Sequence, residues 1–300
     1  MAKKRTKKKK KTAFSARLTK IERTILWLIV LIIVCFALSQ IYTNRQTNTE
    51  SAERIHTEEQ YDSSPKYELS ANLEIPKLSV SRSQQIIRHA GYTVSYNADY
   101  RIANWVAYEL TGKEATSALV KRKNTFYKDP AIKGAAAISS DYSQSGFDRG
   151  HLAPAADMRW SAEAMKHSFY LSNICPQMPG LNRGPWATLE DQCREWAREK
   201  EHLYIAVGPV LTSGMKRIGE NDISVPKKFY KVLCSSTGGV PEVLAFVFEN
   251  KNYKREEPEE FICTVDAVED LTGIDFFPSL PDEIENEIEA RTSMQNWKFN

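Results

Sequence analysis

Two stretches of the chain decide its fold: GFDRGHLAP at residues 146–154 and LNRGPWATLEDQ at residues 181–192. The first places His151 between Arg149 and an apolar run. The second places Asn182 three residues before a proline. Proline favours the first position of a helix, so a helix is predicted to begin there and to run to about residue 200. A potential base, an amide oxygen and cations therefore lie close together in the sequence.

Taken singly, these residues have structural explanations. A lone histidine is more often structural than catalytic, and Asn182 is well suited to cap the N-terminus of the predicted helix. Glu190 and Arg194 have the spacing of an ordinary ion pair on a helix. Arg149 is a better candidate for a ligand contact, because its planar guanidinium suits phosphate. Single residues therefore do not decide the function.

Together, the motifs resemble those of the DNA/RNA non-specific endonuclease family, the sugar-non-specific nucleases of the ββα-metal fold. The resemblance rests on DRGH (148–151), YLSNICPQ (170–177), LNxGxWxxLE (181–190), NWVAY (104–108) and LTGIDFF (271–277). It extends over roughly residues 86–282. This combination of motifs in this order is much more specific than DRGH alone.

The resemblance implies that His151 is the general base that takes a proton from the attacking water. A reference pKa of about 6.5 would leave its imidazole mostly neutral at pH 7. It also implies that Asn182 is the direct protein ligand of one divalent metal ion. Mg²⁺ is the first expectation and Mn²⁺ the second, because hard cations prefer oxygen ligands and keep most of their waters. Glu190 would hold a water that belongs to this metal.

Further residues follow from the same resemblance. Arg149 and Arg194 would contact or neutralise the phosphate. Asn173 would belong to the catalytic residues as a supporting position near the histidine. The family often has another arginine upstream of the Asp-Pro pair at residues 129–130. Arg122 is the candidate for that substrate-binding position, although Lys123 fits the spacing as well.

The predicted elements mix strands and helices without a βαβ rhythm, which favours the α+β class. A hairpin is predicted from residues 91–96 and 102–110, and the segment 168–174 reads as extended. Buried strands are predicted at 203–207, 229–234 and 243–248, and helices at 161–167, 185–200, 265–271 and 283–290. The resemblance implies a ββα-metal nuclease fold with a mixed, mainly antiparallel central sheet flanked by helices.

Charge is segregated along the chain. Residues 1–45 carry 12 of the 41 lysines and arginines and one acid, which leaves residues 46–300 with a net charge of −8. The body is therefore acidic although the whole chain has a formal charge of +3. Any site for DNA or RNA on the body must be a local cationic groove.

Residues 1–85 predict a membrane anchor followed by a stalk. Residues 24–44 form a run of 21 uncharged, mostly apolar residues, long enough to cross a bilayer as a helix. The basic residues 1–23 predict a cytoplasmic tail by the positive-inside rule, with the body on the periplasmic or outer side of a bacterial inner membrane. A cleaved signal peptide is the alternative. Residues 45–85 are polar and predict a stalk, followed by an endonuclease domain at 86–300.

Two features stay open in the sequence. Four cysteines lie in the body, and an oxidising compartment would permit two disulfides, but the spacing gives no pairing: Cys175, Cys193, Cys234 and Cys263. The oligomeric state is also undetermined, with a homodimer among the options.

The sequence thus predicts a membrane-anchored, metal-dependent endonuclease that hydrolyses DNA and RNA with little sequence preference. Two alternatives remain: a catalytically silent nucleic-acid-binding protein on the same fold, and a phosphodiesterase for another substrate. The presence of His151, Asn182 and Glu190 together argues against the silent binder.

Overall fold

A seven-stranded sheet is the centre of the domain in the computed structural model, which describes residues 72–299. Its strands follow the order β12 (Ile262–Cys263), β11 (Val240–Glu249), β10 (Lys228–Thr237), β7 (His202–Pro209), β4 (Ile102–Thr111), β3 (Tyr92–Asn97) and β2 (Gln85–His89). Every neighbouring pair is antiparallel. The α+β class is confirmed, and the expectation of a mixed sheet is corrected to an antiparallel one.

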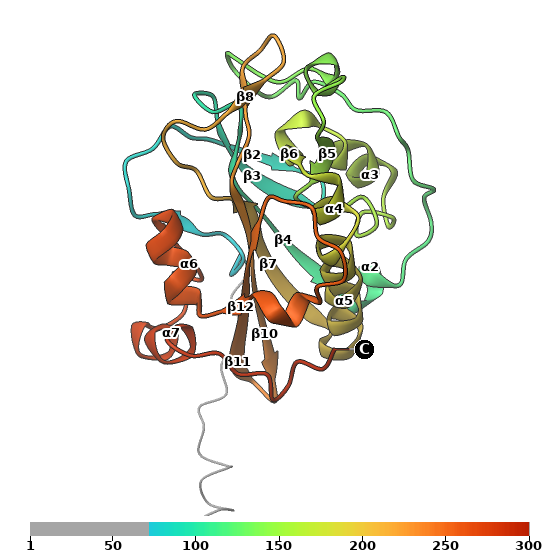
Figure 1. The fold of residues 1–300 in the computed structure, drawn as a ribbon. Helices are drawn as coiled ribbons and strands as arrows, with labels where there is room; N and C mark the ends of the chain where they lie inside the picture. Colours follow the sequence, from blue (N-terminus) through green and yellow to red (C-terminus); the bar gives the residue numbers. More distant parts are fainter. Residues whose placement is uncertain (1–71, 300) are drawn as a thin grey trace, which may run out of the picture. The chain divides into compact units, whose positions relative to one another are not determined.

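Alternation along the strands separates two apolar cores, one on each face of the sheet. In β10, Phe229 and Leu233 belong to one core, and Tyr230 and Val232 to the other. This is the period-two pattern of a strand that is buried on both faces. Each core needs its own covering layer, and the helices divide between the two faces (Figure 1).

The first face carries the DRGH hairpin and the long helix α5. The hairpin consists of β5 (Asp148–His151) and β6 (Ile174–Gln177), and the helices on this face are α2 (Gly112–Ala115), α3 (Ala162–Ser168), α4 (Pro179–Asn182) and α5 (Pro185–Lys200). Trp186 and Leu189 of α5 pack into the core beside Phe229. Two strands followed by a helix are the arrangement that the family resemblance implied.

The second face is covered by α6 (Val265–Thr272) and α7 (Asp282–Glu289) (Figure 1). Thr264 caps α6 at its start, and Gly273 ends it in the left-handed conformation with φ of 65°. A short pair of strands, β1 (Lys77–Leu78) and β13 (Ile274–Asp275), lies outside the main sheet. A second short pair is β8 (Arg217–Ile218) with β9 (Ile223–Ser224), and single 3₁₀ turns are η1 (Ser139–Tyr142), η2 (Leu171–Asn173) and η3 (Pro258–Phe261).

The last residues of the chain brace α5. Trp297 is 1% exposed and packs edge-on against Trp196, with ring centroids 5.1 Å apart. The backbone carbonyl of Lys298 accepts hydrogen bonds from Trp196 Nε1 and Gln192 Nε2. The C-terminal segment therefore holds the second half of the helix that carries Glu190.

Several sequence expectations need correction. Residues 168–174 are not one extended segment, because η2 interrupts them before β6 begins. The predicted stalk reached residue 85, but Leu73 is fully buried and β1 pairs with β13, so the folded domain starts earlier. Strand β2 was not predicted. The four described cysteines are free thiols, without a disulfide among them: Cys175, Cys193, Cys234 and Cys263.

The predicted anchor at residues 24–44, the tail and most of the stalk lie outside the described residues. Within residues 72–299, no helix has the length and apolar character needed to cross a membrane.

Candidate active site

The DRGH hairpin is locked by close contact at Gly150. This residue lies opposite Cys175 in the β5–β6 pairing, and a Cβ added to it would lie 2.0 Å from Oε1 of Gln177. Real Cβ atoms do not approach so closely, so only glycine fits. Gln177 is fully buried, so its side chain has no free space into which to move. The hairpin therefore holds Arg149 and His151 at fixed positions.

His151 lies in an aromatic setting. Its ring meets Phe169 edge-on at a centroid distance of 5.0 Å and Phe126 at 5.6 Å. The residue is 8% exposed, and its Nε2 has no hydrogen-bond partner among the described residues. Burial, assisted by the positive charge of Arg122, lowers the pKa of His151 to about 3. The imidazole is therefore neutral at physiological pH and more weakly basic than the reference value of about 6.5 suggests.

Two arginines gather around this histidine. The Arg149 guanidinium lies 5.2 Å from the centroid of Phe126, donates from Nη2 to the carbonyl of Ser139, and has no partner for its Nε among the described residues. Arg122 is exposed and lies 5.6 Å from the ring of Phe169. The charge of Arg122, rather than that of Lys123, is the one that acts on His151, which favours Arg122 for the upstream arginine position.

Asn182 does not cap the long helix, as its position in the sequence had suggested. It is the last residue of α4, and α5 starts at Pro185 without a side-chain cap. Its Nδ2 donates to Oδ2 of Asp148 at 2.9 Å. The exposed Arg183 binds the same carboxylate through Nε at 2.7 Å and Nη2 at 2.6 Å. This carboxylate therefore fixes which way the Asn182 amide faces.

Asp148 is anionic in this arrangement. Partial burial opposes its ionisation, but the hydrogen bonds from Arg183 and Asn182 outweigh burial and hold the pKa of Asp148 below its usual value. Arg183 is exposed, and its charge is paired with Asp148.

Glu190 lies one helical turn after Trp186 on α5. Burial raises the pKa of Glu190 to about 7, with Lys231 and Arg194 pulling it down and Asp157 pushing it up. Because neutral and ionised forms would be comparably populated near pH 7, the surrounding charges decide its state.

Arg194 was predicted to contact the phosphate, but in the structure it forms ion pairs with residues of the protein. Its Nη1 donates to the buried Asp157 at 2.8 Å, and its Nη2 binds Asp191. Its side chain is 13% exposed. Arg194 therefore anchors α5 to the segment after β5. Of the arginines predicted to bind the substrate, Arg122 is exposed and Arg149 has an unused Nε among the described residues.

Asn173 supports the site without reaching a substrate. It is fully buried, accepts from the backbone N–H of Ala153, and donates to the carbonyls of Ala153 and Ser168. These bonds fix the chain directly after His151. Asn173 was grouped with the catalytic residues from the family resemblance, and the structure gives it a positioning role.

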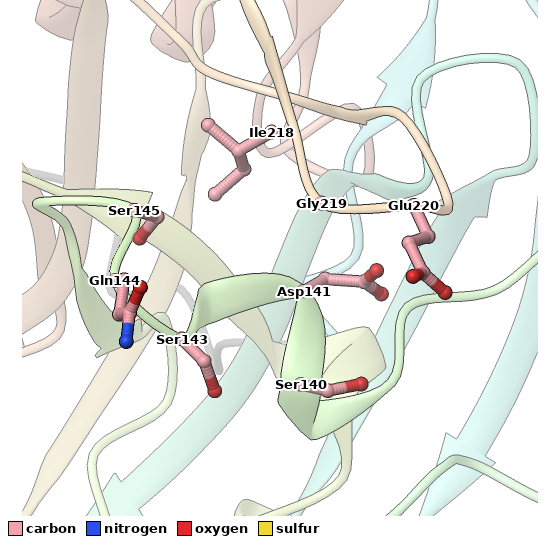
Figure 2. A pocket seen from close by; sticks show the side chains of 8 residues that line it. All are labelled: Ser140, Asp141, Ser143, Gln144, Ser145, Ile218, Gly219 and Glu220. Atoms are coloured by element: carbon pink, nitrogen blue, oxygen red, sulfur yellow. The ribbon is translucent and has the colours of Figure 1, made fainter.

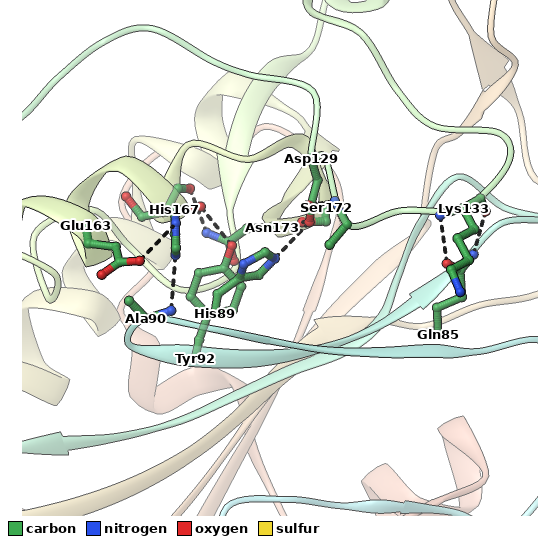
Figure 3. A network of polar contacts seen from close by, with 12 residues as sticks. Gln85, His89, Ala90, Tyr92, Asp129, Lys133, Glu163, His167, Ser172 and Asn173 are labelled. Carbon is green, nitrogen blue, oxygen red and sulfur yellow. Dashed lines mark hydrogen bonds and ion pairs between the residues drawn. The ribbon is translucent and has the colours of Figure 1, made fainter.

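A second polar network lies beside Asn173 (Figure 3). Asp129 Oδ2 lies 2.6 Å from Oγ of Ser172 and 2.8 Å from Nε2 of His89. The Asp129 side chain is completely buried and that of His89 is 6% exposed. This network joins strand β2 and the Asp-Pro loop to η2, so it is part of the platform behind the site.

Two hollows flank the hairpin. One lies between residues 140–145 and the turn at Ile218–Glu220 (Figure 2). Of its two carboxylates, Asp141 is bonded to Ile138 and Asn221, and Glu220 is exposed. The other is lined by Phe147, Met178, Glu249 and three exposed lysines, of which Lys251 pairs with Glu249: Lys216, Lys227 and Lys251. Phe147 directly precedes Asp148, so this second hollow is a cationic surface next to the DRGH hairpin.

These findings agree with the comparisons. A family model described as DNA/RNA non-specific endonuclease matches residues 69–283. The chain belongs to this family. It is 32% identical over 220 residues to mitochondrial endonuclease G of Homo sapiens, covering 69% of this chain and 74% of that protein. It is 31% identical over 221 residues to a nuclease of Serratia marcescens, covering 70% of this chain and 81% of the other.

A solved structure shares the fold. EndoG in the crystal structure of the EndoG/EndoGI complex superposes with a TM-score of 0.63 at 29% identity, covering 66% of this chain and 88% of that one. The protein is therefore a non-specific endonuclease of a divalent-metal-dependent family.

The residues around Asn182 fit a hard divalent cation. The amide Nδ2 is taken by Asp148, so the amide oxygen is the end that remains for a ligand, and oxygen is the donor that Mg²⁺ prefers. A different acidic group, Asp266, Glu269 and Glu289, lies on the α6–α7 face of the sheet. It shares no element with His151 or Asn182, so it is not the metal site of the nuclease.

Sequence reasoning missed two charged residues near α5, Asp157 and Lys231. Lys231 had a signal: it stands in the middle of FYKVLC, a run predicted to be a buried strand. It is 0% exposed. Asp157 had no comparable signal, because its partner Arg194 lies 37 residues away in the sequence.

Proposed function

We propose that this endonuclease hydrolyses phosphodiester bonds of both DNA and RNA, with little sequence preference, at a site formed by His151, Asn182 and Glu190. The observation that carries the proposal is the DRGH hairpin. It holds a neutral, nearly buried imidazole beside Arg122 and Arg149, and its Asp148 contacts the Asn182 amide.

His151 takes a proton from the attacking water. Its neutral ring can accept that proton, and the aromatic walls of Phe126 and Phe169 hold the ring in one orientation. The low pKa of His151 in the free protein reflects burial and the positive charge of Arg122. A phosphodiester anion bound at Arg122 would offset this charge and make the imidazole a stronger base.

Arg122 and Arg149 bind the phosphate. Their planar guanidinium groups suit phosphate oxygens, and the unused Nε of Arg149 offers a donor beside the histidine. Asn182 would hold Mg²⁺, or Mn²⁺, through its amide oxygen, while Asp148 keeps that oxygen facing outward. When bound, the divalent ion stabilises charge on the phosphate and lowers the pKa of a nearby water. Glu190 as a carboxylate would accept a hydrogen bond from such a water.

Breadth of substrate follows from recognition of the backbone. Phosphate contacts carry no direct sequence information. The exposed lysines of the hollow beside Phe147 supply a cationic path on an otherwise acidic body. Binding should therefore weaken steeply as salt concentration rises.

The chain is also proposed to be anchored. The uncharged segment 24–44 would span a bacterial inner membrane, with residues 1–23 in the cytoplasm and the nuclease domain in the periplasm or outside. Protease added to spheroplasts should then degrade the domain while the protein stays in the membrane fraction. Recovery of the intact chain in the soluble fraction would overturn the anchor.

The nuclease is tested with the full chain in detergent. Supercoiled plasmid and single-stranded RNA are each incubated with Mg²⁺ or with EDTA, beside His151→Ala and the control His202→Ala. His202 is the first residue of β7, and its exposed side chain contacts Glu109, so its loss should leave cleavage unchanged. Metal-dependent cleavage of both substrates that disappears only in His151→Ala is expected. Equal cleavage by His151→Ala would refute the assigned base, and binding without cleavage would favour the silent binder.

A further inference from the structure

Lys231 occupies an unusual place for a charged residue. It lies in the middle of β10, between Tyr230 and Val232, which face the α6–α7 side. Alternation therefore turns Lys231 toward α5, on the same side as Phe229 and Leu233. It is 0% exposed, and its Nζ lies 5.0 Å from the ring centroid of Trp186.

The amine has no hydrogen-bond partner among residues 72–299. Burying an ammonium group without a partner is costly, and lysines are almost never fully buried unless paired. A methionine of similar length would fill the same space without that cost. An ammonium at this position is therefore expected to compensate a negative charge close by.

The place of Lys231 under α5 identifies its counterpart. Glu190 lies one helical turn after Trp186, whose ring Lys231 contacts, and the positive charge of Lys231 acts on Glu190 and on Cys193 of the same helix. The other charged groups facing Glu190 are Asp157, from the segment after β5, and Arg194 on α5 itself. The Tyr108 hydroxyl of β4 donates to Asp157.

Arg194 is already shared between two carboxylates, Asp157 and Asp191. Glu190 is therefore left with Lys231 as its main positive neighbour. Two cations, Lys231 and Arg194, then balance two carboxylates, the buried Asp157 and the half-buried Glu190.

We propose that Lys231 is a positioning residue of the nuclease: its buried ammonium, under the helical turn that joins Trp186 to Glu190, stabilises the ionised form of Glu190 that the reaction uses. The inference rests on the proposed function, since Glu190 has its task only in that reaction. The group that stabilises the charge of Glu190 is then a residue of the sheet, Lys231 of β10, rather than the substrate or the metal.

The first test reads Glu190 directly in the full chain without metal. Protein labelled with ¹³C at the glutamate carboxyl carbons is titrated by NMR, and the Glu190 signal is identified by its loss in Glu190→Gln. In Lys231→Met, the titration midpoint of Glu190 should move to higher pH by about one unit or more, the effect expected of a close opposite charge. The control Leu233→Met changes the same face of β10 without altering charge and should leave the midpoint in place.

The second test is a cycle of activity measurements. Lys231→Met should move the acid limb of the cleavage profile to higher pH. A rise of one unit from a midpoint of about 7 lowers the ionised fraction of Glu190 at pH 7 from about one half to about one tenth, so the rate at pH 7 should fall about fivefold. In a Glu190→Gln background the same substitution should have no further effect. The melting temperature of Lys231→Met should fall at pH 7, because the change leaves the carboxylate of Glu190 without its compensating charge.

An unchanged Glu190 midpoint in Lys231→Met would overturn the inference, as would an equal loss of rate in the Glu190→Gln background. If Lys231→Met does not fold, Lys231→Arg decides: it keeps the charge, so the Glu190 midpoint should stay at its wild-type position, and a shift would refute the role. The NMR titration needs no nuclease activity. A wild type that fails to cleave would therefore count against the proposed function alone.

Discussion

Gly150→Ala should damage both the stability and the activity of the domain. A Cβ at this position would lie 2.0, 2.4 and 2.6 Å from Oε1, Cδ and Cγ of Gln177. Gln177 is 0% exposed, so it has no free space into which to withdraw. Forcing extra atoms into a packed core typically costs about 1–3 kcal/mol. For a domain of this size, that corresponds to a fall in melting temperature of roughly 2–12 °C.

Activity should fall more than stability. The hairpin must shift to relieve the overlap, and His151 is the residue that directly follows Gly150. A displacement of about 1 Å at a reacting group can cost about a hundredfold in rate. Calorimetry gives the melting temperature, and plasmid cleavage under saturating Mg²⁺ gives the rate.

The double variant Gly150→Ala with Gln177→Ala is the matched rescue. Removing Cγ, Cδ and Oε1 of Gln177 opens the space that the new methyl group needs, and it also removes two buried polar atoms without partners among the described residues. The double variant should melt above Gly150→Ala and recover part of the rate. A single variant indistinguishable from the wild type, or a double variant no better than the single one, would refute the packing argument.

Three further outcomes are expected. Asp148→Asn releases the Asn182 amide and should lower the affinity for Mg²⁺, so that half-maximal cleavage needs about 10- to 100-fold more Mg²⁺, as the loss of a partner behind a metal ligand does. An unchanged Mg²⁺ titration would contradict the orienting role. Arg122→Ala should slow cleavage about 10- to 100-fold through loss of a charge-assisted bond, and Lys123→Ala should leave it nearly unchanged; equal effects would disprove the assignment of Arg122. Burial and neighbouring carboxylates raise the pKa of Glu289 from 4.5 to about 9, so its contribution to stability is present at low pH and lost as pH rises through that range. Glu289→Gln should therefore stabilise the protein at pH 9 by about 1–3 kcal/mol and not at pH 4, as denaturant unfolding at both values would reveal.

Local chemistry accounts for the elements that the sequence predicted well. Helix α5 runs from Pro185 to Lys200 as expected, because proline at the first position favours a helix start there. The hairpin of β3 and β4 and the buried strands β7, β10 and β11 follow from runs of β-branched and aromatic residues. The family motifs supplied the order of the hairpin and helix around His151.

Long-range pairing accounts for most of what was missed. Nothing near Arg194 in the sequence indicates that Asp157 would bind it, and this partner turns a predicted phosphate contact into an anchor. Asn182 looked like a helix cap because its own neighbours suit one, but Asp148 determines its orientation from another strand. Asn173 likewise satisfies its amide on Ala153 and Ser168, which only the folded chain brings within reach.

The brace formed by Trp297 and Lys298 bears on where this enzyme can be cut or fused. The family match ends at residue 283, so an expression design that follows it would stop before the brace. Such a fragment would uncover Trp196 and remove the carbonyl to which its indole donates. A fusion partner is better placed ahead of residue 72, because Trp297 is buried against α5 and the backbone of Lys298 is bonded to that helix.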